Sequence, residues 1–217
     1  MEKYLYKYLP IGIVFIALIF QYNLFVTPEK LEVKHREILS DVAHTYSTKE
    51  QYNDLKEQLS IMQVKIDKIY ADAREFMKKS GNEKQWVNGY PKKELIYSDI
   101  DKNQLYVVEE NGDIVGVFVY FFGEESTYKN IHQGQWINEE KYGVIHRIAV
   151  SENAHGKGIG AFCFDYALNQ CSNLKIDTHR DNIPMQKVLL KYGFVYCGII
   201  YLDNGAERFA YQIAMTN

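Results

Sequence analysis

From 143 to 150 the chain reads GVIHRIAV, from 151 to 154 SENA, and from 155 to 162 HGKGIGAF. This order predicts a buried strand, a short turn and a glycine-rich loop that leads directly into an apolar helix. Glycines let a backbone come close to a ligand, and the free N–H groups at the start of a helix attract phosphate. The stretch therefore indicates a site for a phosphorylated cofactor. A flexible turn between strand and helix is the alternative, because such glycine spacing is a weak signal by itself.

The residues downstream predict a further strand and helix in alternation. A second apolar strand is expected over 174–178, and Asn182 stands at the opening of the next helix. Gly193 is expected to end that helix, and Phe194 begins a third strand. The chain therefore continues the pattern of strand and helix after the glycine loop.

This order of strand, glycine loop, helix, strand, asparagine, helix and Gly-Phe resembles the GNAT superfamily of N-acetyltransferases over about 62–217. The resemblance implies an α/β (α+β) fold, in which a mixed, mostly antiparallel central sheet is flanked by helices. Hairpins are expected around 111–113 and 203–205, where Asn-Gly pairs occur between apolar runs.

The resemblance also implies a binding site for acetyl-coenzyme A. In this superfamily the glycine loop holds the pyrophosphate, while the preceding strand and the asparagine lie along the pantetheine arm. Gly158 and Gly160 match the glycine pattern, whereas His155 stands where the family prefers arginine or glutamine. A neutral imidazole attracts pyrophosphate less than a guanidinium does, so Lys157 and the backbone amides are expected to contribute. The cofactor-binding residues so implied are Ile148, Val150, His155, Gly156, Lys157, Gly158, Ile159, Gly160, Ala161 and Asn182.

Transfer of acetyl to an amine needs a base for the acceptor nitrogen and an acid for the leaving thiolate. His146 is the candidate base, because alternation along the strand puts it on the face of Ile148 and Val150, and because imidazole titrates near neutral pH. A core histidine bonded to a carbonyl is an equal alternative. The tyrosine that often serves the family as acid corresponds to Leu189, so Tyr192 is the remaining candidate, with a structural aromatic as the alternative. Positioning alone, with solvent taking the proton, is a third option.

Two long segments, 81–93 and 123–142, are expected to be loops. They carry Trp86 and Trp136, which we expect to bind substrate by walling the acceptor cleft, although packing against the sheet is an equal alternative. Asp177 and His179, at the end of the strand over 174–178, offer a second polar pair, and the alternative is that this pair only holds the turn at Asp181-Asn182.

Composition and cysteine spacing give no indication of a nucleic-acid partner or a metal site. The 217 residues carry a formal net charge of -3, and no basic stripe interleaved with aromatics occurs. Cys163, Cys171 and Cys197 lack the spacing of metal ligands, and their apolar neighbours indicate small buried hydrophobic residues.

The first 27 residues predict a membrane anchor. The stretch 8–26 carries no formal charge, and about 20 apolar residues span the ~30 Å hydrocarbon core of a bilayer. A buried core helix is the alternative, which Gln21 and Asn23 favour. Basic residues after the span and the cytosolic supply of acetyl-coenzyme A place the C-terminal body in the cytoplasm. The expected protein is therefore a single-pass membrane protein with a cytoplasmic catalytic domain.

Residues 28–65 predict a helical stalk. Apolar positions alternate at spacings of three and four, which is typical of a coiled coil and indicates a homo-oligomer. From Ile66 the same helix can begin an acetyltransferase domain over 66–217. The superfamily's first strand has no counterpart before this helix, so the sheet edge at 104–110 is expected to be unpaired or covered by another element. The apolar seam comprises Tyr52, Leu55, Leu59, Met62, Ile66, Ile69, Ala73 and Phe76.

Two classes of function follow. The first is a membrane-tethered N-acetyltransferase that moves acetyl directly from acetyl-coenzyme A to a primary amine of a small molecule. The second is a non-catalytic, membrane-tethered module that binds coenzyme A or supports assembly, which the missing tyrosine and the missing first strand favour. Turnover of acetyl-coenzyme A with a set of amines distinguishes the two.

Overall fold

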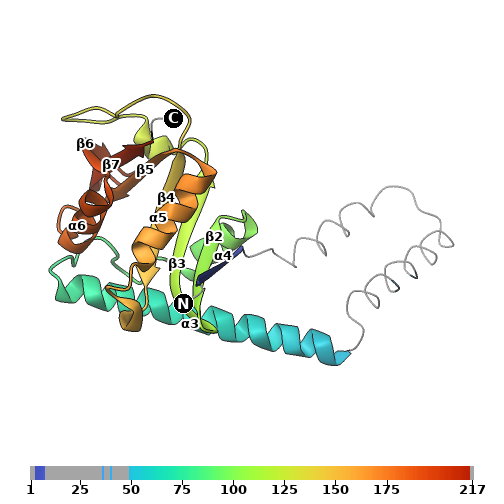
Figure 1. Cartoon of the computed structure of the whole chain (residues 1–217). Coiled ribbons are helices and arrows are strands. Elements are labelled where there is room, and N and C mark those ends of the chain that lie inside the picture. Colours follow the sequence, from blue (N-terminus) through green and yellow to red (C-terminus); the bar gives the residue numbers. More distant parts are fainter. Residues whose placement is uncertain (1–2, 8–35, 37–39, 41–48, 216–217) are drawn as a thin grey trace. The chain divides into compact units, whose positions relative to one another are not determined.

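A seven-stranded sheet forms the centre of the computed structural model, which describes residues 3–7, 36, 40 and 49–215 (Figure 1). Its strands lie in the order β1-β2-β3-β4-β5-β7-β6. Neighbouring strands are antiparallel except β4 and β5, which are parallel, so the expected mixed, mostly antiparallel sheet is confirmed. In chain order the elements are β1 (Lys3–Lys7), α3 (Lys49–Lys79), α4 (Lys93–Asp101), β2 (Leu105–Glu110), β3 (Asp113–Phe122), η1 (Ser126–Tyr128), β4 (Gly143–Val150), η2 (Glu152–Ala154), α5 (Ile159–Gln170), β5 (Asn173–Thr178), α6 (Ile183–Tyr192), β6 (Val195–Tyr201) and β7 (Glu207–Ala214).

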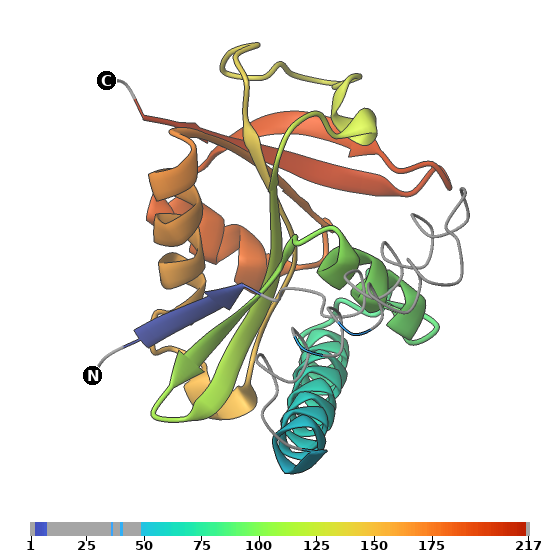
Figure 2. The same cartoon turned by 90° about the vertical axis from the view of Figure 1, so that its right-hand side faces the viewer.

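Helices cover both faces of the sheet, with α5 and α6 on one face and α4 and the end of α3 on the other (Figure 2). The core beneath α5 and α6 contains Phe118, Ile145 and Phe164, all fully buried. A second cluster, which includes Tyr128 and Trp136, lies under the segment between β3 and β4. Both expected hairpins are present, as β2–β3 and β6–β7.

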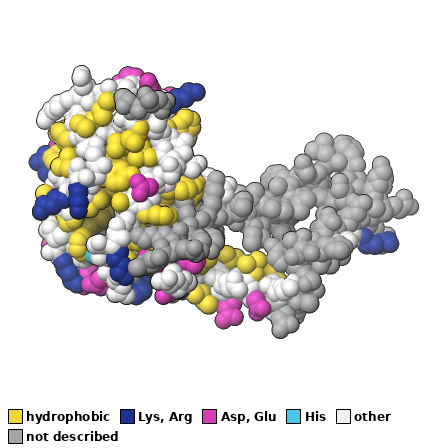
Figure 3. Space-filling model, viewed as in Figure 1, with side chains coloured by type: hydrophobic (Ala, Val, Ile, Leu, Met, Phe, Trp, Pro, Cys, Tyr) yellow, Lys and Arg dark blue, Asp and Glu magenta, His cyan; other side chains and the backbone are white. Residues whose placement is uncertain are grey.

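The long helix α3 continues without a break from Lys49 to Lys79. From Ile66 onward, α3 belongs to the compact unit that contains the sheet. In the upstream part of α3, Tyr52, Ile61 and Val64 are exposed, and hydrophobic side chains are visible along this helix in Figure 3. The coiled coil stays a prediction. The buried stripe that attaches the end of α3 to the domain comprises Ile66, Ile69, Tyr70, Ala73 and Met77.

The superfamily's first strand, which the sequence lacks directly before α3, has a counterpart in β1 at the N-terminus. β1 pairs antiparallel with β2, with Lys3 opposite Glu110 and Lys7 opposite Tyr106. The edge of β2 is therefore covered by another element, which was one of the two outcomes expected from the sequence. This pairing satisfies backbone groups that an open sheet edge would expose.

The pairing of β1 also bears on the predicted membrane anchor. The stretch 8–26 lies outside the described residues, and among the described residues no helix is both long and apolar enough to cross a membrane. A chain that crossed a bilayer once within 8–26 would leave residues 3–7 and 66–217 on opposite sides. Because β1 and β2 belong to one sheet, a single-pass anchor there would require this pairing to be broken, and the anchor itself stays a prediction outside the described residues.

Candidate active site

A cavity of about 330 Å³ lies where β4 and β5 separate. The two strands pair only through 143–145 and 174–176, and beyond these residues they diverge. The loop at 85–90, the start of α6 and the β6–β7 hairpin contribute the remaining walls. Such an opening between parallel strands gives a ligand access to backbone groups that have no strand partner there.

A β-bulge in β4 decides which side chains face this cavity. His146 is opposite Val119 and Ala149 is opposite Val117, so three steps along β4 match two steps along β3. The bulge lies between His146 and Ala149 and contains Arg147, whose φ of 50° is in the left-handed region. His146 and Ala149 consequently lie on the same face, which regular alternation would forbid.

The bulge corrects the expected orientation of His146. Regular alternation placed it with Ile148 and Val150, but these two residues pack against the core beneath α5 and α6. The His146 ring instead contacts the rings of Phe121 and Tyr128, with centroids 5.9 and 6.0 Å away, on the opposite face. His146 still lines the cavity.

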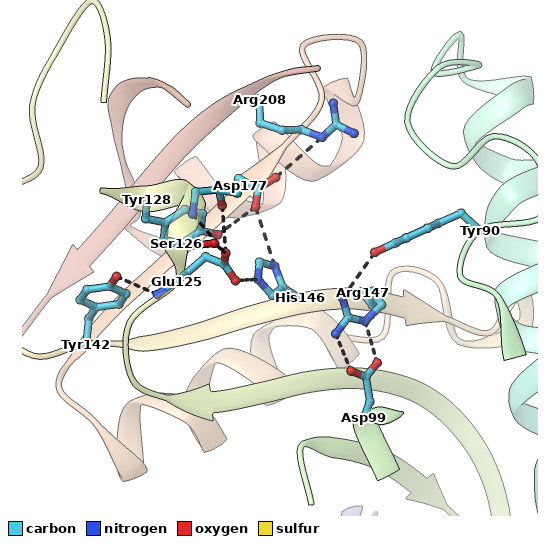
Figure 4. Close-up of polar contacts among 11 residues, drawn as sticks. Tyr90, Asp99, Glu125, Ser126, Tyr128, Tyr142, His146, Arg147, Asp177 and Arg208 are labelled. Atoms are coloured by element: carbon cyan, nitrogen blue, oxygen red, sulfur yellow. Dashed lines mark hydrogen bonds and ion pairs between the residues drawn. The ribbon is translucent and has the colours of Figure 1, made fainter. Parts of the chain in front are cut away.

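Arg147 is held in its unusual backbone conformation by a buried ion pair. Its Nε and Nη2 donate to the two carboxylate oxygens of Asp99 in α4, at 2.8 and 2.7 Å. Asp99 is only 2% exposed, and Nη1 of Arg147 lies 3.4 Å from the hydroxyl of Tyr90 (Figure 4). Burial raises the pKa of Asp99, and the guanidinium opposes this shift. The pair links the bulge to α4 and to the loop that carries Tyr90.

His146 lies between two carboxylates (Figure 4). Its Nε2 is 3.1 Å from Oε2 of Glu125, and its Nδ1 is 3.8 Å from Oδ1 of Asp177. The hydrogen bond with His146 is the main cause that lowers the pKa of Glu125 to about 2, and bonds from Thr127 add to it. Glu125 is therefore ionised at neutral pH and can orient the imidazole and stabilise its protonated form.

The backbone around Glu125 is fixed by aromatic residues. Its N–H donates to the hydroxyl of Tyr142 at 3.1 Å. The ring of Tyr142 also packs on the ammonium of Lys175, which lies 4.1 Å from this ring and 4.2 Å from that of Trp136. These contacts hold the segment between β3 and β4 against β5, and they set the position of Glu125.

Asp177 connects His146 to a buried arginine. Its Oδ1 accepts a hydrogen bond from the hydroxyl of Tyr128 at 2.8 Å, and its Oδ2 is 3.8 Å from Nε of Arg208. Arg208 is 8% exposed and lines the cavity. The polar end of the cavity thus contains two carboxylates, one imidazole and one loosely paired guanidinium.

The glycine loop has the geometry expected of an anion site at the start of α5. Gly156 and Gly158 have φ values of 78° and 79°, and Gly158 is the N-cap residue of α5. A Cβ atom added to either glycine would have no other atom within 4 Å, so the space beside the loop backbone is open to a ligand. The free N–H groups at the start of α5 suit the pyrophosphate of acetyl-coenzyme A.

His155 and Lys157 both have partners in the protein. The ring of His155 lies 4.8 Å from that of Phe76, and its Nε2 is 3.1 Å from the carbonyl of Val150. The ammonium of Lys157 is 3.9 Å from a carboxylate oxygen of Glu110. The backbone of the glycine loop is therefore its main contribution toward a phosphate.

Asn182 and Thr178 provide a polar wall on the cofactor side. Oδ1 of Asn182 caps α6 by accepting from the N–H of Met185 at 3.2 Å, and its Nδ2 donates to Gln85 at 2.9 Å. Thr178 is 1% exposed and lines the cavity, and its hydroxyl has no hydrogen-bond partner within the part of the chain that the structure describes. An orphan hydroxyl beside diverging strands fits a polar arm such as pantetheine.

The two tryptophans have different positions. Trp86 lines the cavity, as expected for a residue of the acceptor cleft. Trp136 is 6% exposed and donates from Nε1 to the carbonyl of Tyr128 at 2.9 Å, so it packs on the sheet as in the alternative interpretation. Of the implied cofactor residues, Ile148 and Asn182 line the cavity.

Tyr192 is placed away from the cavity lining. Its hydroxyl donates to Asp165 of α5, and its ring lies between those of Phe164 and Phe194. Burial raises its pKa, and Asp165 adds to that increase. Leu189 is fully buried in the core. The structure does not bring Tyr192 together with His146.

Cys163 and Cys197 are buried and Cys171 is partly buried, all as free thiols. No cluster of three or more histidine, cysteine, aspartate or glutamate side chains that could hold a metal ion occurs within residues 3–7 and 49–215.

Comparisons with known proteins agree with this geometry. The family model for the acetyltransferase (GNAT) family matches residues 66–194. The chain belongs to the GNAT acetyltransferase family. Membership is consistent with acetyl transfer from acetyl-coenzyme A, and the matched range contains β2 to β5, the glycine loop, α6 and most of the cavity lining.

Solved structures show the same fold. A GNAT acetyltransferase from Streptococcus agalactiae is 31% identical, covers 70% of this chain and 89% of its own, and has a TM-score of 0.64. A putative acetyltransferase from Staphylococcus aureus is 28% identical, covers 71% and 93%, and has a TM-score of 0.52. A GNAT acetyltransferase from Listeria monocytogenes, 20% identical with a TM-score of 0.52 and coverage of 70% and 88%, shares the fold. A search of curated proteins found no match.

Proposed function

We propose that the protein is an N-acetyltransferase that moves acetyl directly from acetyl-coenzyme A to a primary amine of a small molecule. The observation that carries this proposal is the His146–Glu125 pair, at 3.1 Å, inside the cavity where β4 and β5 diverge. A base held by a carboxylate beside a predicted cofactor groove is what the acceptor amine requires.

Acetyl-coenzyme A supplies the reactive thioester, and the residues of the chain hold it. The amides of Gly158 to Gly160, at the start of α5, are assigned to the pyrophosphate. Ile148 in the bulged part of β4 and Asn182 at the start of α6 are assigned to the pantetheine arm, and both line the cavity. This assignment places the thioester end of the arm toward His146.

His146 is assigned to the proton of the acceptor. With Nε2–H donated to Glu125, its Nδ1 is free to accept a proton from the ammonium, either directly or through water. The nitrogen lone pair then forms the new C–N bond, the C–S bond breaks, and the thiolate takes a proton from the amine or from solvent. Glu125 and Asp177 stabilise the imidazolium that forms.

The setting of this reaction is also part of the proposal. The domain is assigned to the cytoplasm, where acetyl-coenzyme A is available, and no membrane tether is included because β1 pairs with β2. Self-association through α3 is supported by its heptad spacing and by the seam residues Tyr52, which is exposed, and Leu55 and Leu59, which are partly exposed.

The alternative is a non-catalytic module that binds coenzyme A. It is favoured by the place of Tyr192, whose hydroxyl is bonded to Asp165 outside the cavity. A module of this kind would bind acetyl-coenzyme A but would release no thiol in the presence of amines.

The test is release of coenzyme A thiol from acetyl-coenzyme A in the presence of a library of amines and amino acids. His146→Ala is expected to lower turnover roughly 100-fold and to remove the acidic limb of the pH profile, while acetyl-coenzyme A binding measured by calorimetry is unchanged. His132→Ala is the matched control, because His132 is exposed and lies outside the cavity. Cofactor binding without turnover by any acceptor would support the non-catalytic module instead.

A further inference from the structure

The polar end of the cavity contains an arginine that acetyl transfer to a simple amine does not need. Arg208 extends from β7 and lines the cavity while only 8% of its surface is exposed. Its Nη1 donates to the carbonyl of Glu207 at 2.8 Å. Within the described part of the chain its Nη2 has no hydrogen-bond partner, and its closest carboxylate oxygen, on Asp177, is 3.8 Å from Nε.

The second buried arginine of the site shows how loose this pairing is. Arg147 binds both oxygens of Asp99 through two hydrogen bonds of 2.7 and 2.8 Å. Asp177, in contrast, already accepts a hydrogen bond from Tyr128 at 2.8 Å and faces His146 as well. Burial lowers the pKa of Arg208, and Asp177 opposes this shift. A buried guanidinium with a free edge is costly unless an anion completes its pairing.

We propose that the acceptor is a small amino acid, whose amine faces His146 and Glu125 and whose carboxylate binds Arg208. This inference rests on the proposed acetyl transfer and adds the class of acceptor. Planar guanidinium groups bind carboxylates through two parallel hydrogen bonds, and the free edge of Arg208 in the cavity offers such donors.

The spacing of the charged groups fits an acceptor with its amine and carboxylate close together. One carboxylate, that of Asp177, reaches His146 with Oδ1 and Arg208 with Oδ2, at 3.8 Å each. The base and the guanidinium are therefore separated by little more than a carboxyl group. An amino acid presents its two charges over a similarly short distance.

The balance of charge in the cavity excludes other acceptor classes. Glu125 and Asp177 attract the ammonium, and they repel a doubly charged phosphate. A simple amine or a polyamine would leave the guanidinium of Arg208 without its anion. A zwitterion satisfies both ends, because it adds one positive and one negative charge.

The experiment compares amino acids with the amines that result from their decarboxylation: phenylalanine with phenethylamine, and leucine with 3-methylbutylamine. The thiol released from acetyl-coenzyme A gives kcat/KM for each acceptor. The ratio of kcat/KM between an amino acid and its amine is expected to be on the order of 100 in the native protein, since a charged hydrogen-bonded pair is lost with the carboxylate. In Arg208→Gln this ratio is expected to fall to about 1.

Two controls distinguish a change in acceptor specificity from a loss of folding in Arg208→Gln. Arg180→Gln changes a neighbouring arginine that pairs with Glu207 outside the cavity, and it is expected to keep the native ratio. Calorimetry with acetyl-coenzyme A and thermal unfolding establish that Arg208→Gln is folded.

Each outcome decides one of the two proposals. If the simple amines are acetylated as well as the amino acids, or if Arg208→Gln keeps the native ratio, the amino-acid inference is overturned while acetyl transfer stands. If neither group of acceptors reacts although acetyl-coenzyme A binds, the proposed acetyl transfer fails, and the acceptor class fails with it.

Discussion

Removal of one partner from the ion pair between Arg147 and Asp99 is expected to destabilise the domain strongly. Asp99 is 2% exposed, and both of its oxygens are occupied by the guanidinium at 2.7 and 2.8 Å. Asp99→Ala leaves that guanidinium buried without a carboxylate. Breaking a buried pair in this way costs about 3–5 kcal/mol, which corresponds to a fall in Tm of roughly 6–20 °C for a chain of this size.

The backbone of Arg147 allows a sharper form of this prediction. Its φ of 50° lies in the left-handed region, which glycine adopts without strain. In Arg147→Gly the ion pair is absent but the strain of a non-glycine residue is also relieved, by about 1 kcal/mol. Asp99→Ala introduced into the Arg147→Gly background is therefore expected to cost less than in the native background, with a coupling free energy of about 2 kcal/mol or more.

Urea unfolding followed by circular dichroism, on the native chain, the two single variants and the double variant, measures this coupling. If each variant has the same m value as the native protein, the surface exposed on unfolding is the same, and the free energies of unfolding can be compared. Additive effects, or a cost of Asp99→Ala below about 1 kcal/mol, would refute the claim that this pair holds the bulge. A stable Asp99→Ala variant with native turnover would also show that the position of His146 does not depend on this ion pair.

Three further predictions test the cofactor loop, the acidic partner of the base and the N-terminal strand. Gly158→Val places a β-branched residue at a φ of 79° and is expected to weaken acetyl-coenzyme A binding, measured by calorimetry, on the order of 100-fold. In Gly160→Ala the added methyl group would meet only a side-chain atom at 3.7 Å, so the affinity is expected to stay within about threefold of native. The pKa of Glu125 in the folded state is about 2, below the usual glutamate value of 4.5, so the stabilisation from its ionised form is present above about pH 4.5 and is lost as the pH falls toward 2. The difference in Tm between the native protein and Glu125→Gln should therefore shrink over that pH range, and a constant difference would contradict the pairing with His146. Tyr4 and Glu109 are opposite each other in the β1–β2 register, so the double variant Tyr4→Cys with Glu109→Cys should form an intrachain disulfide under mild oxidation. The disulfide would appear as a shift in electrophoretic mobility that a reductant reverses. A disulfide found only between chains would contradict the pairing of β1 with β2 of the same chain.

The parts of the fold that sequence could predict are those encoded by neighbours in the chain. The glycine loop, the strand before it and the end of α6 at Gly193 each follow from local rules for turns and caps, and Gly193 indeed has a φ of 114°. The hairpin turn at Asn111-Gly112 follows from the same kind of rule, since both residues have positive φ. Local conformational preference is sufficient where no distant contact competes with it.

The orientation of His146 shows where such local rules stop. Alternation assumes regular pairing with the next strand, but the extra residue in β4 is set by the register against β3 and by the ion pair of Arg147 with Asp99 in α4. The two partners are 48 residues apart in the chain. A period-2 pattern contains no information about such a contact, so the face of His146 could not be predicted from it.

Glu125 and Arg208 were missed for a related reason. Glu125 lies in a long loop without periodicity, and its place beside the base depends on Tyr142, which is 17 residues downstream. Arg208 occurs in a strand of ordinary alternation, where a charged residue usually faces solvent. Its burial comes from the segment between β3 and β4 that covers this face of the sheet. One signal was available: a charged residue at a position that alternation assigns to the same face as Ala210 and Gln212, both fully buried.

Two neighbouring segments of the N-terminus suit two physical demands that exclude each other. Nineteen uncharged residues over 8–26 meet the length and polarity that a bilayer requires. β2, however, also requires a partner for the N–H and C=O groups of its outer edge, and residues 3–7 provide it for residues 106–110. A single chain cannot meet both demands at once, because crossing the bilayer within 8–26 would carry β1 away from β2. Any insertion of this stretch as a single span must therefore separate β1 from β2 and expose that edge, at the cost of five residues of strand pairing. The pairing of β1 thus links the state of the N-terminus directly to the integrity of the sheet that holds the cavity.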